Sequence, residues 1–533
     1  MQPVDRQPVR RAPAWRARLL VPVAAFVGAV ACVTLAVPAA AQEPVDHATI
    51  ERIKAEAMQH SQVMETMSWL TDVYGPRLAN SPNYRKAADW TSTQLKQWGL
   101  TNVHYEAWTG FGRGWENSRF SLQAVGANSF PIIAYPRAWS PGTDGPVTGD
   151  AVLVQIDSAA DFAKYRGTLA GKFVLTTPAR TAPDSLVNRP MRLSDSALRA
   201  LAEPPLPTPP RQGPPPGFNQ GAFRFANERM VFLAREGVAG VLLQARGQEG
   251  TVFTDNGYPR SDTATAVPPT VHVASEQYGR IARMLARKVP VSLELDMRNV
   301  FHKADSNTFN IVAEIPGTDP ALKAEVVMLG GHFDSWHAGT GATDNAAGSA
   351  VMLEAVRILK ALGLKPKRTI RIALWGGEEE GLFGSRAFAR QHYRDSTTAP
   401  DKPEAAAFSS YFNVDNGSGK IRGVYLQGNE AVRPIFEAWM GPFNAMGMST
   451  TTIRNTGGTD HLAFDAVGLP GFQFIQDGLQ YDTRTHHSNM DVYEEVQPED
   501  MKFNAAVVAS FVWQAAQRAE KLPRKPAPVR TAQ

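Results

Sequence analysis

Three short segments in the middle of the chain carry side-chain types that bind metals. They read GGHFDSW at 330–336, GATDNAAG at 341–348 and WGGEEEGLFGS at 375–385. Zinc takes imidazole nitrogens and carboxylate oxygens as ligands. Each segment offers such ligands beside an expected strand end or helix start, so the three together predict one metal site.

His332 and Asp334 follow the apolar run 326–329, where a buried strand should end. Positions two apart in a strand share a face, so these side chains should point the same way. An imidazole that binds zinc is commonly oriented by a carboxylate on its second ring nitrogen. We therefore expect His332 to be a ligand and Asp334 to orient it.

Asp344 follows a glycine-rich loop and begins a segment with a helical pattern, which Gly363 should end. The apolar stripe of this helix consists of Ala347, Val351, Ala355, Ile358, Leu359 and Leu362. A carboxylate at a helix start is often an N-cap. The position alone therefore leaves Asp344 as either a cap or a metal ligand.

Glu378, Glu379 and Glu380 lie just beyond a strand expected over 369–375. Open α/β sheets bind ligands at the carboxyl ends of their strands. A solvated turn of three acids is the alternative, but the flanking glycines favour a site. There, one carboxylate could bind a metal while its neighbour takes a proton from metal-bound water.

Asp415 in YFNVDNGSG and His487 in THHSNMD complete a larger pattern. Together these segments closely resemble the zinc aminopeptidase and glutamate carboxypeptidase family of co-catalytic two-zinc exopeptidases. In that family a His, a bridging Asp, a Glu pair, a second Asp and a C-terminal His occur in this chain order. The resemblance implies peptide substrates and an α/β fold with a mixed, mainly parallel central sheet flanked by helices.

The resemblance also implies a role for each residue. Two zinc ions share five ligands, with His332, Asp344 and Asp415 around one ion and Asp344, Glu379 and His487 around the other. Glu378 is the implied general base, which passes a proton to the leaving amine. The family pattern Glu-Glu-x-Gly-Leu aligns only with 378–382, so Glu380 should be a bystander.

Two neighbouring histidines compete for the last ligand position. The family ending His-[Ser/Thr]-x-x-Asp matches His487, with Ser488 and Asp491 after it, better than His486. We therefore expect His487 to be the ligand and His486 to be a neighbour in the cleft.

A second loop resembles the family at GGTDHLAF, residues 457–464. In the family a polar residue of this loop contacts the substrate carbonyl, which makes His461 a candidate oxyanion stabiliser. A structural loop histidine is the alternative. Family members also tend to hold a cis peptide after the bridging Asp, so we expect one between Asp344 and Asn345.

The N-terminus predicts export to the periplasm or the extracellular space. Four arginines between positions 10 and 18 precede an apolar run at 19–37, and three alanines end at Ala41. This pattern is typical of a secretory signal peptide over 1–41, although an uncleaved anchor has a similar length. After cleavage we expect no stable membrane anchor.

Cleavage would also change the charge of the chain. It removes five arginines and Asp5, which leaves 50 basic and 50 acidic side chains out of 55 and 51. Nothing in the sequence then suggests the Lys/Arg-rich face needed for nucleic-acid binding. The single cysteine, Cys32, lies in the segment removed, so the remaining chain should form no disulfide.

The peptidase domain should be discontinuous, over 42–130 and 296–520. The stretch LTDVYGPRLANSPNYRKAADW, which begins at Leu70, resembles its opening. We expect 131–295 to be an insert that resembles a protease-associated domain and shapes substrate access, with a stability element as the alternative. Its proline-rich stretch at 203–217 should be an exposed loop and a candidate flap, and 521–533 should be a disordered tail.

The direction of trimming is less constrained by the sequence. The family includes aminopeptidases and carboxypeptidases, and the chain has no evident arginine cluster for an acidic C-terminal residue, which favours an aminopeptidase. Rival interpretations are a glutaminyl cyclase, which has a related fold and one working zinc, and a catalytically silent receptor or scaffold. The full set of five ligands and the general base favour a peptidase.

Overall fold

The computed structural model describes residues 43–180, 191–205, 220–303, 307–396 and 399–525. The expected signal peptide with Cys32, most of the proline-rich stretch and residues 526–533 of the expected tail lie outside these residues. Within the described residues, the helices are all too short or too polar to cross a membrane.

The first of two sheets carries the segments singled out above. Its strand order is β1 (Thr101–Trp108), β10 (Thr308–Ile315), β12 (Thr369–Trp375), β11 (Val326–His332), β13 (Phe408–Asn413), β16 (Gly471–Gln476), β14 (Ile421–Tyr425) and β15 (Thr450–Thr452). The four central strands from β12 to β16 pair in parallel, whereas β1, β10 and β14 pair antiparallel with their inner neighbours. A mixed, mainly parallel sheet is therefore confirmed.

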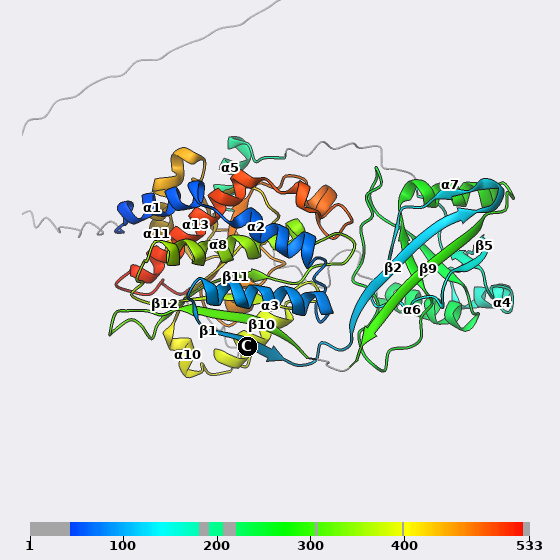
Figure 1. Cartoon of the computed structure of the whole chain (residues 1–533), viewed down its shortest axis with the longest axis horizontal. Helices are drawn as coiled ribbons and strands as arrows, with labels where there is room; N and C mark the ends of the chain where they lie inside the picture. The colour runs from blue at the N-terminus through cyan, green and yellow to red at the C-terminus, as the bar shows by residue number, and fades with distance from the viewer. Residues whose placement is uncertain (1–42, 181–190, 206–219, 304–306, 397–398, 526–533) are drawn as a thin grey trace, which may run out of the picture. The chain divides into compact units, whose positions relative to one another are not determined.

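Helices cover both faces of this sheet because its central strands are apolar on both sides. In β11, Val327 and Leu329 pack into one core with α1 (His47–Gln59), α8 (Ala347–Ala361) and α13 (Pro498–Gln517), which lie together in Figure 1. Met328 points to the other face, where α9 (Phe383–His392) and α12 (His461–Asp465) contribute a second core. This alternation follows the two-residue period of a strand.

Several local predictions are confirmed. Strand β12 spans the expected 369–375, and α8 ends just before Gly363, which has a φ of 63° and suits a helix C-terminus. The N-cap of α8 is Ala346. Asp344 is therefore not its cap, which removes that alternative.

The second sheet has the order β3 (Phe130–Pro131), β2 (Gly114–Val125), β9 (Ser292–His302), β5 (Val147–Leu153), β6 (Phe173–Leu175), β7 (Gly240–Gln244), β8 (Thr270–Val273) and β4 (Ala134–Pro136). Its long antiparallel pair, β2 with β9, extends beyond the expected boundaries of 131 and 295 on both sides. Between β6 and β7 the chain forms the long helix α6 (Gln220–Arg235).

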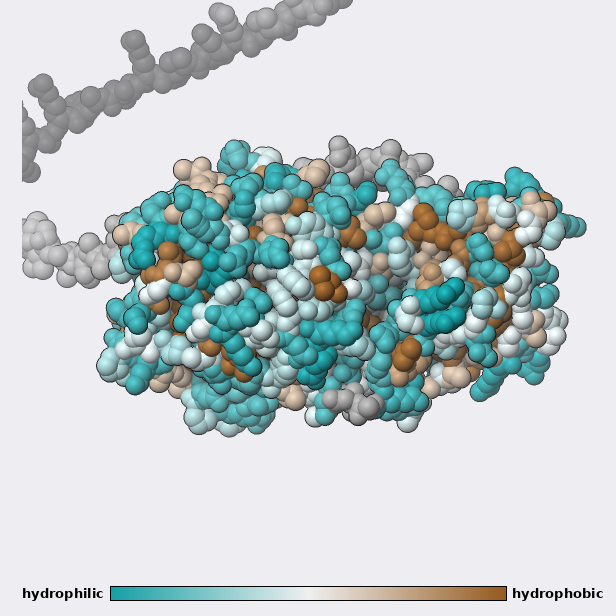
Figure 2. Space-filling view, in the orientation of Figure 1, coloured by the Kyte–Doolittle hydropathy of each residue, from teal (hydrophilic) through white to brown (hydrophobic). Residues whose placement is uncertain are grey.

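An apolar cluster joins the two sheets. Trp108 and Trp336 from the first-sheet region pack in one cluster with Trp139 and Val241 from the second. Figure 2 shows polar side chains over most of one face, with hydrophobic residues in small separate patches. Most large apolar side chains are thus used within the cores and this junction.

Candidate metal centre

The central strands of the first sheet end at the same edge. His332 at the end of β11 pairs in register with Trp375 at the end of β12, and Gly330 pairs with Asn413 at the end of β13. Glu378 and Asp415 follow these strands within a few residues. The parallel pairing therefore brings three separate sequence segments to one place.

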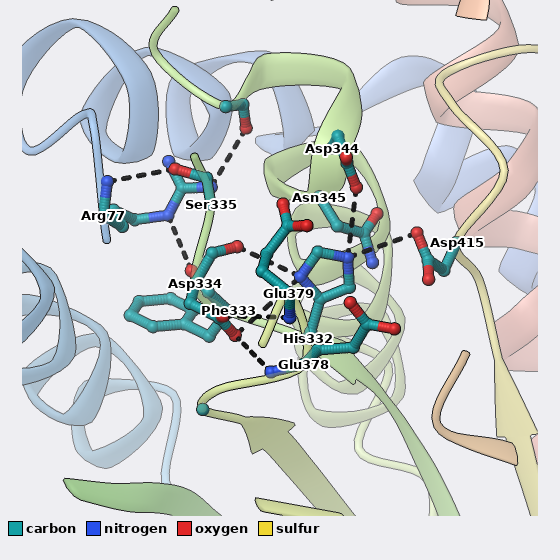
Figure 3. Close-up of polar contacts among 12 residues, drawn as sticks. Arg77, His332, Phe333, Asp334, Ser335, Asp344, Asn345, Glu378, Glu379 and Asp415 are labelled. Atoms are coloured by element: carbon teal, nitrogen blue, oxygen red, sulfur yellow. Dashed lines mark hydrogen bonds and ion pairs between the residues drawn. The ribbon is translucent and has the colours of Figure 1, made fainter. Parts of the chain in front are cut away.

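His332 lies at the centre of the first group of candidate ligands. Its Nε2 is 3.2 Å from Asp344 Oδ1 and 3.2 Å from Asp415 Oδ1 (Figure 3). Burial alone would lower the pKa of His332, but Asp415 and Glu378 raise it well above its ordinary value. This edge of the sheet thus favours a positive charge.

Asp344 stands between two histidines. Its second oxygen, Oδ2, lies 3.3 Å from His487 Nε2 and has no hydrogen-bond partner among the described residues. The peptide bond between Asp344 and Asn345 is cis, as expected. Asp491 holds Thr343, the residue before Asp344. Its Oδ1 accepts hydrogen bonds from Thr343 N at 2.6 Å and from Thr343 Oγ1 at 2.8 Å.

The second group of candidate ligands forms around His487. Its Nε2 lies 2.9 Å from Glu379 Oε2, and burial, which alone would lower its pKa, is outweighed by Glu379 and Asp344, which raise that pKa to about 11. The neighbouring His486 lies farther from Asp344 Oδ2, at 3.7 Å, and its side chain is 39% exposed. The distances favour His487 over His486, although both rings reach Asp344.

Asp334 does not orient His332 in the way we expected. Its carboxylate Oδ1 is 3.9 Å from His332 Nδ1, whereas its backbone carbonyl is 3.0 Å from that nitrogen. The carboxylate instead accepts hydrogen bonds from the backbone N–H groups of Glu378 at 3.2 Å and Glu379 at 3.3 Å. The carboxylate of Asp334 thus contacts Glu378 and Glu379, and its backbone carbonyl contacts His332.

Glu378 lies beside the ligand groups without an ion pair to either histidine in the described residues. In Figure 3 its carboxylate and that of Glu379 lie on opposite sides of the His332 ring. Burial, together with Asp415 and Asp460, raises the pKa of Glu378 well above its ordinary value. A carboxyl group of raised pKa is suited to take up a proton.

The geometry around His461 does not match an oxyanion donor. The ring is fully buried, its Nε2 lies 3.2 Å from the Thr456 carbonyl, and burial lowers its pKa to about 4. With Nε2 donating to that carbonyl, the neutral ring has no second N–H to offer. Its role towards substrate stays a prediction.

The second sheet contributes to the wall of the centre. Thr254 N donates to the backbone carbonyl of His487 at 2.9 Å, and Val252 N donates to Asn489 Oδ1 at 2.7 Å. The ring of Trp336 lies 6.0 Å from that of His487. The loop that carries His487 is thus fixed by a segment far from it in sequence.

The donor set fits a divalent metal. Asp344 Oδ2 and Glu379 Oε1 are buried without hydrogen-bond partners among the described residues. Buried carboxylate oxygens are costly unless a cation or a donor satisfies them. Nitrogen and oxygen donors at this spacing are the combination that zinc accepts.

The comparisons with known proteins agree with this chemistry. A family model described as "Peptidase family M28" matches residues 310–512, which include all five candidate ligands. The chain is thus similar to peptidase family M28 over residues 310–512. The chain is accordingly a metallopeptidase with peptide substrates.

Several similar proteins align with most of the chain and not only with residues 310–512. Carboxypeptidase Q of Mus musculus is 27% identical over 463 residues, which cover 86% of this chain and 87% of that protein. A peptidase M28 precursor from Shewanella amazonensis SB2B has a TM-score of 0.62 at 23% identity, covering 90% of this chain and 99% of that one. The zinc aminopeptidase BSAP from Bacillus subtilis has a TM-score of 0.53 at 18% identity, over 86% and 95% of the two chains. The solved structures support the fold.

Some residues of the M28 site gave no clear signal in the sequence. Asn345 donates to the Val414 carbonyl at 2.9 Å and accepts from Gly348 N at 2.9 Å, so it ties the Asp344 loop to β13 and α8. Arg77 lies behind the site and belongs to an N-terminal segment that is far from the other site residues in sequence. A lone Arg or Asn is usually exposed, so neither could be assigned from residue type.

Proposed function

We propose that this chain is an exopeptidase that binds two zinc ions and trims peptides from one end. One observation carries the proposal: the two oxygens of Asp344 face different histidines, with His332 3.2 Å from Oδ1 and His487 3.3 Å from Oδ2. A carboxylate in that position can bridge two ions. His332 and Asp415 would complete one site, and Glu379 and His487 the other.

Zinc ions bound there would lower the pKa of water and polarise the scissile carbonyl. Glu378 would take the proton from the attacking water and deliver it to the leaving amine. Asp334 would hold the Glu378 backbone in place through its hydrogen bond to that N–H. His461 remains a candidate for contact with the substrate carbonyl, provided that its ring turns away from Thr456.

The trimming direction that we propose first is that of an aminopeptidase. The sequence has no evident arginine cluster for an acidic C-terminal residue, which favours a substrate with a free amine. A carboxypeptidase is the second candidate, because the relative that aligns with 86% of the chain is named carboxypeptidase Q.

One peptide in two forms distinguishes these candidates. The zinc-loaded protein is incubated with a peptide that has a free or an acetylated N-terminus, and products are followed by mass spectrometry. Cleavage only of the free form, with N-terminal residues released, supports the aminopeptidase. Equal cleavage with C-terminal residues released supports the carboxypeptidase.

Zinc content separates the exopeptidase from more distant alternatives. We expect about two zinc ions per chain. A value near one would favour a glutaminyl cyclase. A chain that binds no zinc would favour a scaffold and would refute the proposed function.

We further propose export and an inserted domain. The arginine-rich start and apolar run of residues 1–41 support a cleaved signal peptide and a periplasmic or extracellular location. The second sheet, from β2 to β9, supports an inserted domain over about 114–302. N-terminal sequencing of the mature protein, with Gln42 expected first, tests the cleavage site.

A further inference from the structure

Arg77 lies fully buried behind the metal centre, between a π-helical turn at Trp69–Val73 and α3 (Pro82–Gln97). Its guanidinium donates to four backbone carbonyls: Phe333 from Nε at 2.8 Å, Leu70 at 2.7 Å and Thr340 at 3.1 Å from Nη1, and Gly341 from Nη2 at 3.0 Å. Its own backbone exchanges two hydrogen bonds with Ser335, through Arg77 N to Ser335 Oγ at 3.0 Å and Ser335 N to the Arg77 carbonyl at 3.1 Å. Figure 3 shows this contact on the far side of Asp334 from His332.

Three of the four carbonyl partners of Arg77 lie at the two ends of one loop. Residues 333–341 connect β11, which ends at the candidate ligand His332, with the segment that carries Asp344. Phe333 begins this loop, and Thr340 and Gly341 end it. One rigid, planar guanidinium therefore fixes the distance between the start and the end of the loop.

The chemistry of the contact is specific to arginine. Four carbonyls in different directions need several N–H donors in one plane, which a lysine ammonium cannot supply from a single point. Substitution at Gly341 is also blocked, because a Cβ there would lie 2.2 Å from Ser335 Cβ. The loop thus has little freedom to reach the same geometry in another way.

The positive charge of Arg77 also belongs to the centre. The N–H groups of its guanidinium donate to backbone carbonyls. Burial lowers the pKa of Arg77 to about 10, while the carboxylates of Asp491, Asp334 and Asp344 act to raise that pKa. The group therefore remains a cation at neutral pH. A buried cation is tolerated when carboxylates lie nearby, and here the nearby carboxylates are those of the metal centre.

We propose that Arg77 is a positioning residue for the metal centre, which fixes the loop 333–341 so that Asp334 and Asp344 present their carboxylates at the correct spacing. This inference rests on the proposed zinc-binding function. Arg77 contacts no candidate ligand side chain in the described residues. A positioning role predicts that substitution of Arg77 weakens the affinity for zinc, whereas a purely structural role predicts only a loss of folding stability.

Arg368 provides a matched control. It is also buried, at 1% exposure, and donates to the backbone carbonyls of Arg518 and Ala519 as well as to Glu325 Oε2 at 2.7 Å. It precedes β12, at the end of that strand opposite to Glu378. Arg368→Lys thus removes a similar network at a distance from the centre.

The experiment measures zinc binding to the full chain after removal of metal with a chelator. Wild type, Arg77→Lys and Arg368→Lys are titrated with zinc against a competing indicator, and their melting temperatures are measured without metal. Loss of a group that positions ligands typically weakens metal affinity about 10- to 100-fold. We expect a loss of that size for at least one zinc ion in Arg77→Lys and less than about a twofold change in Arg368→Lys.

Four results would overturn the inference. Arg77→Lys could bind zinc as tightly as wild type, or Arg368→Lys could weaken zinc as much at an equal loss of melting temperature. Wild type that binds no zinc would refute the proposed function itself, and the positioning role with it. If Arg77→Lys does not fold, Ser335→Ala takes its place, because it removes the acceptor for Arg77 N together with one hydrogen bond to the Trp336 carbonyl; unchanged zinc affinity in that variant would also overturn the inference.

Discussion

The two sheets of this protein both contain parallel strands, but the ionisable residues that follow these strands differ. In the second sheet, β6, β7 and β8 run parallel, and the first ionisable residues after β7 and β8 are Arg246 and Glu276, which have opposite charges. In the first sheet, β12 and β13 are followed by Glu378 and Asp415. The strand arrangement alone therefore does not make a site; the residues that follow the strands do.

The carboxylates of the two regions are also balanced differently. In the second-sheet region Asp255 is paired within the protein, with Arg137 Nε at 2.9 Å and His272 Nε2 at 3.4 Å. At the metal centre, Asp344 and Glu379 each retain a buried oxygen without a hydrogen-bond partner among the described residues. A paired carboxylate stabilises the fold by itself, whereas the carboxylates of the centre call for an added cation.

The largest effect should come from Glu378→Gln. The amide keeps the size of the side chain but cannot accept the proton, so kcat should fall by about two to four orders of magnitude. Zinc content, measured by mass spectrometry of the metal, should stay near that of wild type. The neighbouring Glu380→Gln is the control, and its turnover should remain close to wild type. Near-normal turnover in Glu378→Gln would remove Glu378 from the mechanism.

A second test compares the metal centre directly with the Asp255 ion pairs of the second-sheet region. Asp344→Asn should bind fewer zinc ions than wild type, and its melting temperature should not respond to chelator. Wild type should lose the stabilisation that bound zinc provides, about 4 kcal/mol at a thousandfold excess over Kd. Calorimetry with and without chelator measures this difference.

Asp255→Asn is the counterpart in the second-sheet region. It removes a partly exposed ion pair, which is worth about 1 kcal/mol or less. Its melting temperature should fall slightly, and its response to chelator should equal that of wild type. If Asp255→Asn also lost the chelator response, the contrast between the two regions would be wrong.

The part of the fold that could be predicted from sequence is the part with local signals. Alternating Ile370, Ile372 and Leu374 gave β12 its bounds, and the helical stripe gave α8. The extension of the second sheet to β2 and β9 had no such signal. These strands lie more than 150 residues apart in the chain, and their pairing depends on long-range register, which periodicity does not reveal.

Among the candidate ligands, His332 could be predicted from its place after an expected strand, and Asp415 and His487 from the family resemblance. The function of Asp334 could not, because residue type does not tell whether the carboxylate or the backbone carbonyl meets His332. Arg77 could not be predicted either. Its partners are backbone carbonyls, and any residue type can supply a carbonyl.

The smallest predicted effect is a change in melting temperature on substitution of His392, whose protonated ring bridges two carboxylates. His392 Nδ1 lies 3.1 Å from Glu404 Oε2, and its Nε2 lies 3.1 Å from Glu106 Oε1. Burial alone would lower its pKa, but Glu106 and Glu404 raise it. Both ring nitrogens thus face carboxylates, so the protonated ring has no lone pair left for a metal.

A raised pKa fixes the sign of the pH dependence at His392. The stabilisation is fully present below the ordinary histidine pKa of about 6.5 and is lost as the pH rises through the higher pKa of the folded state. The melting temperature of wild type should therefore exceed that of His392→Gln by about 1–3 °C near pH 6 and by less near pH 9. Scans in excess chelator keep zinc from contributing. His104→Gln, at an exposed position of β1, should show no such trend, and a difference for His392→Gln that grows with pH would contradict the assignment of a protonated bridge.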